Sequence, residues 1–233
     1  MSAYRGFIAG LKTVGAMTPI GSGIVTMIDE FVPSAHDKAN AEATKIVAER
    51  LDELGERFDE TYLKTNEFAD LFKNCYAAIQ RTQHKEKQLA AANTICSMLL
   101  RDAEDGKLPY EELDHFARCI ENLSIGAFEL LRKAIERAEL GMGNGRHKLA
   151  VEREPVTMTF GTLRSLFPNT VDHDLLMGLV QELNSYHLLH FRGASSVRLE
   201  QYSNFPIDAT PLGYRFVKHI LKPGEQPTCD EKE

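Results

Sequence analysis

Tryptophan is absent from the 233-residue sequence, and basic residues are too few to dominate its surface. The 27 Lys and Arg residues are outnumbered by 34 Asp and Glu residues, which gives a net charge of −7. This balance excludes a protein coated with basic residues for sequence-independent binding of nucleic acid, because such binding depends on cations that face the phosphates. The charge balance does not exclude a local basic patch. The composition, with 43% hydrophobic residues, is typical of a globular protein of one or two domains.

Cysteine is also scarce, and its spacing argues against a metal centre. The four cysteines include no CxxC pair, and their separations fit no zinc-ribbon or zinc-finger pattern. Cys75, Cys96 and Cys119 lie among apolar residues of expected helices, where a thiol behaves as a small hydrophobic group, and Cys229 lies near the C-terminus. We therefore expect reduced cysteines, a cytoplasmic location and no bound metal.

No stretch is long and apolar enough to predict a membrane-spanning helix. The longest uncharged run, residues 13–28, has 16 residues and contains Pro19, whereas a spanning helix needs about 20 predominantly apolar residues. Glycines are frequent in this region, and the spacing of Gly6 and Gly10 allows two helices to pack closely in a membrane. We interpret the glycines as packing or turn positions of a helical bundle. The alternative is a membrane-active defence effector that inserts residues 1–33.

Helical periodicity dominates the first 140 residues. Residues 3–31 favour two short helices, and a sequence like a capping box opens a longer helix over residues 34–59. Further helices are expected to begin near residues 65, 84, 109 and 124. The polar residues 84–87 are interpreted as the solvated start of one of them. We therefore predict an all-helical domain over residues 1–140.

The pattern changes after residue 140. Three glycines within residues 141–145 end the last of these helices and begin a linker, which we place at residues 141–156. The second predicted domain is residues 157–222, and the acidic residues 223–233 are expected to be a disordered tail. The expected elements of the second domain are helices over 161–167 and 172–186, strands over 188–192 and 197–202 joined by a turn at 193–196, and a last helix that begins at Thr210. The predicted fold class is mainly α, with an all-helical N-terminal bundle and a small α+β domain.

The second domain resembles a winged-helix domain of the kind common in bacterial regulators. The resemblance is carried by the order helix, helix, two-stranded hairpin, helix, by the spacing of Leu183 and Leu188 before the hairpin, and by ATPLGYRFV at residues 209–217. The first domain is similar to uncharacterised bacterial helical proteins, some from prophage or phage-defence neighbourhoods, in TPIGSG at residues 18–23 and RTQHKEKQLAAANTI at residues 81–95. Because those proteins have no settled activity, the resemblance carries over no catalytic residue.

The outer face of the expected helix 172–186 bears on the choice between DNA and protein as the partner. A winged helix that reads DNA places its second helix in the major groove, with polar and basic side chains toward the base edges. This helix has three acidic residues on its outer face and no Lys or Arg, so a protein partner or self-association is favoured, and a DNA-binding regulator is the alternative. The candidate contacts to DNA or to a partner are Gln181 and Asn184 on this helix, Arg192 and Arg198 on the hairpin, and Arg215 and Lys218 on the last helix.

Catalytic and cofactor motifs are missing from the sequence. Residues 21–23, Gly-Ser-Gly, lack the lysine and the spacing of a phosphate-binding loop. His115 and Cys119 have the i, i+4 spacing of metal ligands but no second ligand pair, and we interpret them as residues at the edge of the core. His187 and His190 are interpreted as residues at the boundary of the hairpin. We therefore predict a non-enzymatic protein without a metal or another cofactor.

Overall fold

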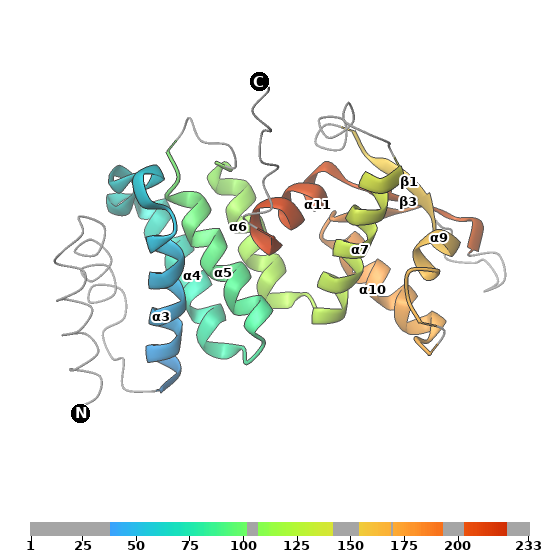
Figure 1. Ribbon diagram of the computed structural model, residues 1–233, viewed down its shortest axis with the longest axis horizontal. Coiled ribbons are helices and arrows are strands. Elements are labelled where there is room, and N and C mark those ends of the chain that lie inside the picture. Colours follow the sequence, from blue (N-terminus) through green and yellow to red (C-terminus); the bar gives the residue numbers. More distant parts are fainter. Residues whose placement is uncertain (1–37, 102–106, 142–153, 169, 193–202, 223–233) are drawn as a thin grey trace, which may run out of the picture. The chain divides into compact units, whose positions relative to one another are not determined.

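A computed structural model of the chain describes residues 38–101, 107–141, 154–168, 170–192 and 203–222 (Figure 1). The described chain is mainly helical and has a three-stranded antiparallel sheet. This confirms the predicted fold class at the level of a mainly helical protein with a small sheet. Several predictions concern residues outside the described ranges. They are the helices within 3–31, the membrane insertion of 1–33, the strand over 197–202 with Arg198, and the tail 223–233.

The described chain forms two compact units. Unit 1 contains the residues up to Glu121 together with His219–Leu221, and unit 2 contains Asn122–Lys218 and the segment that begins at Lys222. The boundary near residue 121 differs from the predicted domain end at residue 140. The physical reason is that the helix after this boundary, α7 (Ile125–Gly141), packs against elements of unit 2.

Four α-helices and two short 3₁₀-helices, together with residues 219–221, form the described part of unit 1. They are α3 (Lys38–Asp52), η1 (Gly55–Arg57), η2 (Glu60–Lys64), α4 (Asn66–Arg81), α5 (Lys85–Met98) and α6 (Tyr110–Asn122). Helix α5 lies at the centre, because it packs against both α3 and α4 and is buried from Ala90 to Met98 (Figure 1). The alanines at 90–92 have no side chain beyond Cβ, which lets neighbouring helices approach closely.

Two polar residues inside this buried helix bond to backbone carbonyl groups. Thr94 Oγ1 donates to Ala90 O at 2.9 Å, and Asn93 Nδ2 donates to Ile220 O at 2.7 Å. A buried donor without such an acceptor is costly. The Asn93 bond therefore stabilises the position of residues 219–221 within unit 1.

Helix α4 begins and packs as its sequence predicts. Thr65 is the N-cap residue, since its Oγ1 accepts a hydrogen bond from Phe68 N at 3.1 Å. Phe68, Phe72 and Tyr76 follow one another along the buried face, with ring centroids 5.8 Å and 5.5 Å apart. The i, i+4 spacing in the sequence thus becomes one continuous aromatic stripe.

The predicted helix 34–59 is too long at its C-terminal end. Helix α3 ends at Asp52, and Gly55 adopts a φ of +53°, which residues other than glycine rarely adopt. Phe58 then forms an isolated antiparallel bridge with Leu100 instead of a further helical turn. Phe58 is buried from extended backbone rather than from a helix, because Gly55 redirects the chain.

The sheet of unit 2 has the strand order β1-β3-β2, and both pairs are antiparallel. Its strands are β1 (Val156–Thr159), β2 (Leu189–Phe191) and β3 (Pro206–Ala209). Strand β2 lies within the predicted strand 188–192, but its described partner is β3. The sequence pattern predicts neither β3 nor β1. Both strands have only four residues, and they pair across about fifty residues of chain (Val156 with Ala209).

Unit 2 also contains a long helix and several shorter ones. They are α7, α9 (Phe160–Arg164), α10 (His173–Ser185), α11 (Pro211–Arg215) and the first part of the π-helix η4 (Phe216–Leu221). Helices α9 and α10 correspond to the predicted helices 161–167 and 172–186. Thr210 is the N-cap of α11 as predicted, since its Oγ1 accepts from Gly213 N at 3.0 Å. Helix α7 packs against α10, α11, β1 and β3 and so forms much of the core of this unit.

Candidate functional site

Helix α10 is held in a fixed orientation by its N-terminal cap, its buried face and the turn before it. Asp172 caps the helix, because its Oδ1 accepts from Asp174 N at 3.2 Å. The Arg164 guanidinium stabilises the turn between α9 and α10 through bonds to the carbonyl groups of Phe167, Pro168 and Val171. The buried face of α10 consists of Leu176, Met177, Val180 and Leu183. The opposite face of a well-anchored helix is thereby presented to solvent.

That opposite face carries no positive charge. We call it the α10 face and define it by Leu175, Gly178, Gln181 and Ser185, which recur at intervals of three or four residues and are all exposed. The Leu175 side chain is 57% exposed, which makes it one of two large exposed hydrophobic residues in the described chain. A Cβ atom added to Gly178 would meet no atom within 4 Å. An exposed leucine therefore stands beside a position where the helix surface is bare backbone.

Glu182, at the edge of the α10 face, bonds to the beginning of α7. Its carboxylate accepts hydrogen bonds from Ser124 N and, at 2.9 Å, from Ser124 Oγ. Ser124 Oγ in turn accepts from Ala127 N at 3.2 Å, as an N-cap does. A carboxylate next to the N-terminus of a helix is stabilised by the helix dipole. This acid thus has a role in packing α10 on α7, which the sequence pattern did not reveal.

The structure gives an internal partner to Asn184, one of the two predicted base-reading residues. Asn184 Oδ1 accepts from Phe191 N at 3.0 Å and so joins the end of α10 to β2. The side chain of Gln181 is exposed on the α10 face. Of the two amides, Asn184 is therefore used within the fold, and Gln181 is exposed to solvent.

Arg192, predicted as a hairpin contact, forms an ion pair with a buried acid. Its Nε donates to Asp208 Oδ2 at 2.7 Å, and Asp208 is 1% exposed. Thr157 Oγ1 donates to the other oxygen of this carboxylate at 2.7 Å. Asp208 was missed because β3 was not predicted, so nothing in the sequence placed a carboxylate beside Arg192.

The other predicted contacts are Arg198 on the expected hairpin and Arg215 and Lys218 in the last helical segment. Lys218 has its ammonium group 5.8 Å from the centroid of the Tyr214 ring, a cation–π arrangement within the last helical segment. Arg215 is half-buried, and Arg198 lies outside the described residues. Of the predicted residues, Asn184, Arg192 and Lys218 thus have contacts within unit 2, and Gln181 is exposed on the α10 face.

The histidines that the sequence analysis considered as ligands have separate surroundings. The His115 ring is tilted against Phe116 with centroids 6.2 Å apart, and burial raises the pKa of the Cys119 thiol to about 12. His187 has a φ of 59° just after α10, and His190 lies opposite Asp208 in the sheet. His115 is half-buried beside the fully buried Cys119, whereas His187 and His190 are exposed.

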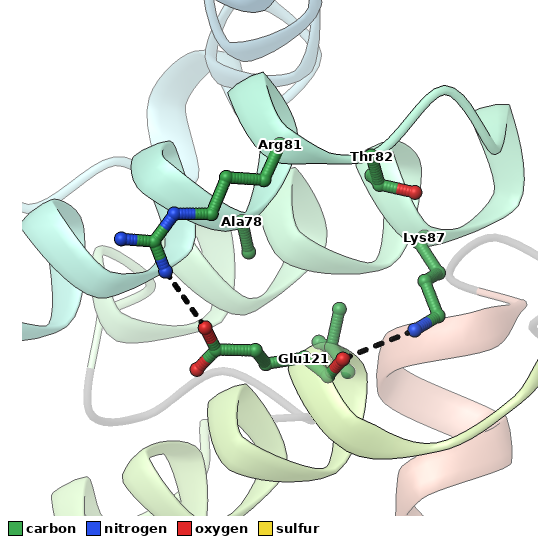
Figure 2. A pocket seen from close by; sticks show the side chains of 6 residues that line it. Ala78, Arg81, Thr82, Lys87 and Glu121 are labelled. Atoms are coloured by element: carbon green, nitrogen blue, oxygen red, sulfur yellow. Dashed lines mark hydrogen bonds and ion pairs between the residues drawn. The ribbon is translucent and has the colours of Figure 1, made fainter.

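A second candidate site is a pocket of about 300 Å³ in unit 1, at the ends of α4, α5 and α6 (Figure 2). Across it, Arg81 Nη1 donates to Glu121 Oε1 at 2.9 Å, and Lys87 Nζ donates to the Glu121 backbone carbonyl at 3.2 Å. The remaining lining residues are Ala78, Thr82 and Ile120. The sequence does not predict this pocket, because Glu121 is 40 residues away from Arg81 in the chain.

The described residues contain no helix with both the length and the hydropathy needed to cross a membrane. Nor does this part of the chain contain a group of three or more His, Cys, Asp and Glu side chains that could hold a metal ion. Comparison of the chain with protein-family models, with curated proteins and with solved structures found no match.

Proposed function

We propose that unit 2 is a winged-helix module of a non-enzymatic bacterial interaction or regulatory protein, of the prophage or phage-defence type, and that it binds a protein through the α10 face. The chain order α7, β1, α9, α10, β2, β3 and the sheet order β1-β3-β2 support the winged-helix assignment. In this assignment α7 is the first helix of the module, and α9 and α10 are its helix-turn-helix pair. The fold alone does not specify the ligand, so the choice depends on the surface of α10.

The exposed Leu175 on a face without Lys or Arg is the observation that carries the choice of a protein partner. Contacts to DNA come mainly from basic side chains on phosphates and from amides or guanidinium groups on base edges. On this module Asn184 and Arg192 are bonded internally to Phe191 and Asp208. A partner that covers Leu175 removes apolar surface from water, which favours association.

The test compares Leu175→Asp with the matched control Leu140→Asp. Leu140, near the end of α7, is the other large exposed hydrophobic residue of the described chain, at 76%. Each full-length variant is immobilised and exposed to a lysate of the native organism, and its self-association is measured by sedimentation velocity. We expect Leu175→Asp to weaken the association at least about tenfold, since burial of a leucine side chain contributes roughly 1.5–3 kcal/mol. Leu140→Asp should behave as the wild type.

Two results would contradict the proposal. If the wild type is monomeric and captures the same proteins as Leu175→Asp, the α10 face is not a protein contact. A gel shift with DNA from the native locus covers the alternative of a DNA-binding regulator. A salt-sensitive shift that Gln181→Ala and Arg198→Ala weaken would favour that alternative.

A further inference from the structure

The pocket of unit 1 combines an apolar floor with a charged rim (Figure 2). Ala78 on α4 and Ile120 on α6 are buried beneath it, whereas Arg81 is exposed and Lys87 half-buried at its edge. Small-molecule sites typically have this composition, with a few polar groups around apolar walls, and their volumes begin near 300 Å³. The pocket therefore has room for one small molecule rather than for a peptide.

Positive charge exceeds negative charge among the residues that line this pocket. Figure 2 shows Arg81 and Lys87 directed toward Glu121 from opposite sides. The Arg81 guanidinium bonds to the Glu121 carboxylate, and the Lys87 ammonium group bonds to the Glu121 backbone carbonyl. Two cations and one carboxylate thus line the pocket. A guanidinium has five N–H donors, so its bond to Glu121 does not use its full capacity.

The position of Lys87 in the chain adds to this imbalance. It is the third residue of α5, in the first helical turn, where Lys85 also lies and Glu86 is the one acidic residue. The N-terminus of a helix carries a partial positive charge, so this end of α5 favours an anion. An anion in the pocket would meet both Arg81 and Lys87.

We propose that this pocket binds the phosphate group of a small phosphomonoester. The planar guanidinium of Arg81 matches two phosphate oxygens, and the ammonium group of Lys87 supplies a second, point-like cation. A phosphate carries more negative charge than a carboxylate, so it competes with Glu121 for Arg81. This proposal concerns unit 1 and stands independently of the function proposed for unit 2.

The test is a titration of the full-length ¹⁵N-labelled chain with inorganic phosphate at low ionic strength, followed by the amide NMR signals of residues around the pocket. Low salt is needed because exposed charges are screened by ions. Arg81→Gln and Lys87→Gln should each weaken binding about tenfold, as expected for loss of a hydrogen bond to a charged group. Lys85→Gln is the matched control, since Lys85 is exposed in the same helical turn but does not line the pocket. It should change the affinity less than about twofold.

Glu121→Gln separates a specific site from general attraction of anions. It removes the carboxylate that competes for Arg81, so we expect phosphate to bind several-fold more tightly. The far-ultraviolet circular dichroism spectrum of every variant is recorded to establish that it is folded. No saturable shift at the pocket up to about 10 mM phosphate, far above common ligand affinities, would overturn the proposal. Equal weakening by Lys85→Gln and Arg81→Gln would overturn it as well.

Discussion

At the scale of single residues, the buried thiols behave as core residues. Cys75, Cys96 and Cys119 are free and buried. Burial raises the pKa of the Cys96 and Cys119 thiols to about 12 and that of Cys75 above its usual range, because a thiolate is poorly solvated in apolar surroundings. Since the thiolate is the reactive form, these side chains are protected from alkylation and metal binding while the chain is folded.

The raised pKa values predict that alkaline pH destabilises the fold. Above the ordinary thiol pKa of 9.0 the unfolded chain releases these protons, while the folded chain keeps them until about pH 12. The contribution of these thiols to stability is therefore fully present below pH 9 and is lost as the pH rises toward 12. Between pH 8 and pH 10 each buried thiol lowers the free energy of unfolding by roughly 1 kcal/mol.

Urea unfolding at pH 8 and pH 10 measures this effect, in a Cys229→Ser background that leaves only the three buried thiols. Cys119→Ala changes the stability at both pH values through altered packing. The informative quantity is the difference between the two pH values, which should be smaller in Cys119→Ala by roughly 1 kcal/mol. An identical pH difference in both proteins would show that this thiol does not contribute to the alkaline loss.

The packing of unit 2 requires a glycine at position 213 but not at position 178. A Cβ atom on Gly213 would collide with Leu188 O, so the close approach of α11 to the chain before β2 requires glycine there. Gly178, in the middle of α10, meets nothing comparable. A glycine inside a helix is less favourable than alanine by about 1 kcal/mol. Gly178 therefore has a cost that no contact within the described chain explains.

At the scale of elements, the central strand β3 depends on an ion pair. Asp208 is buried between Thr157 on β1 and Arg192 just after β2. A buried carboxylate that loses its cation is strongly destabilising, although the exposed Arg192 side chain, at 54%, moderates the effect. Arg192 is therefore in the first place a structural residue of the sheet.

This role predicts a specific double-mutant cycle. Arg192→Met should lower the free energy of unfolding by about 2 kcal/mol, because it leaves the Asp208 carboxylate buried without a cation. Asp208→Asn in the same chain removes that charge, so part of the loss should be recovered in the double variant. Chemical denaturation of the four proteins gives the coupling energy. Strictly additive losses would contradict the structural role of the pair.

The elements that could be predicted from the sequence are those whose signals are local. Leu113, Phe116 and Ile120 repeat with helical spacing and form the buried stripe of α6, and Thr65 and Thr210 cap the helices that they precede. Strands β1 and β3 were missed because they have four residues each and pair with distant segments. Pro206 begins β3 and a charged residue interrupts its apolar pattern, and both features argue against a strand.

The candidate sites were less predictable than the helices, because they depend on contacts between distant segments of the chain. The exposure of Gln181 on α10 follows from helical spacing alone. The partners of Asn184 and Arg192, by contrast, are set by tertiary contacts to Phe191 and Asp208. Contacts of that kind have no periodic signature in the sequence.

At the scale of the whole molecule, negative charge does not by itself decide the partner. The chain has a net charge of −7, yet the pocket of unit 1 has more cations than anions in its lining. On unit 2, the α10 face has neither Lys nor Arg. We therefore propose different ligands for the two units, a small phosphate for unit 1 and a protein for unit 2.

The most direct measurement of the central claim, that the α10 face binds a protein, uses Gly178→Ala. The free energy of unfolding should rise by about 0.5–1 kcal/mol, because alanine is the better helix former and its methyl group meets no atom of the folded chain. Association through the α10 face, measured in the same capture and sedimentation assays as for Leu175→Asp, should weaken, because the methyl group stands where the partner approaches the helix backbone. A variant that is more stable and associates as strongly as the wild type would contradict the claim.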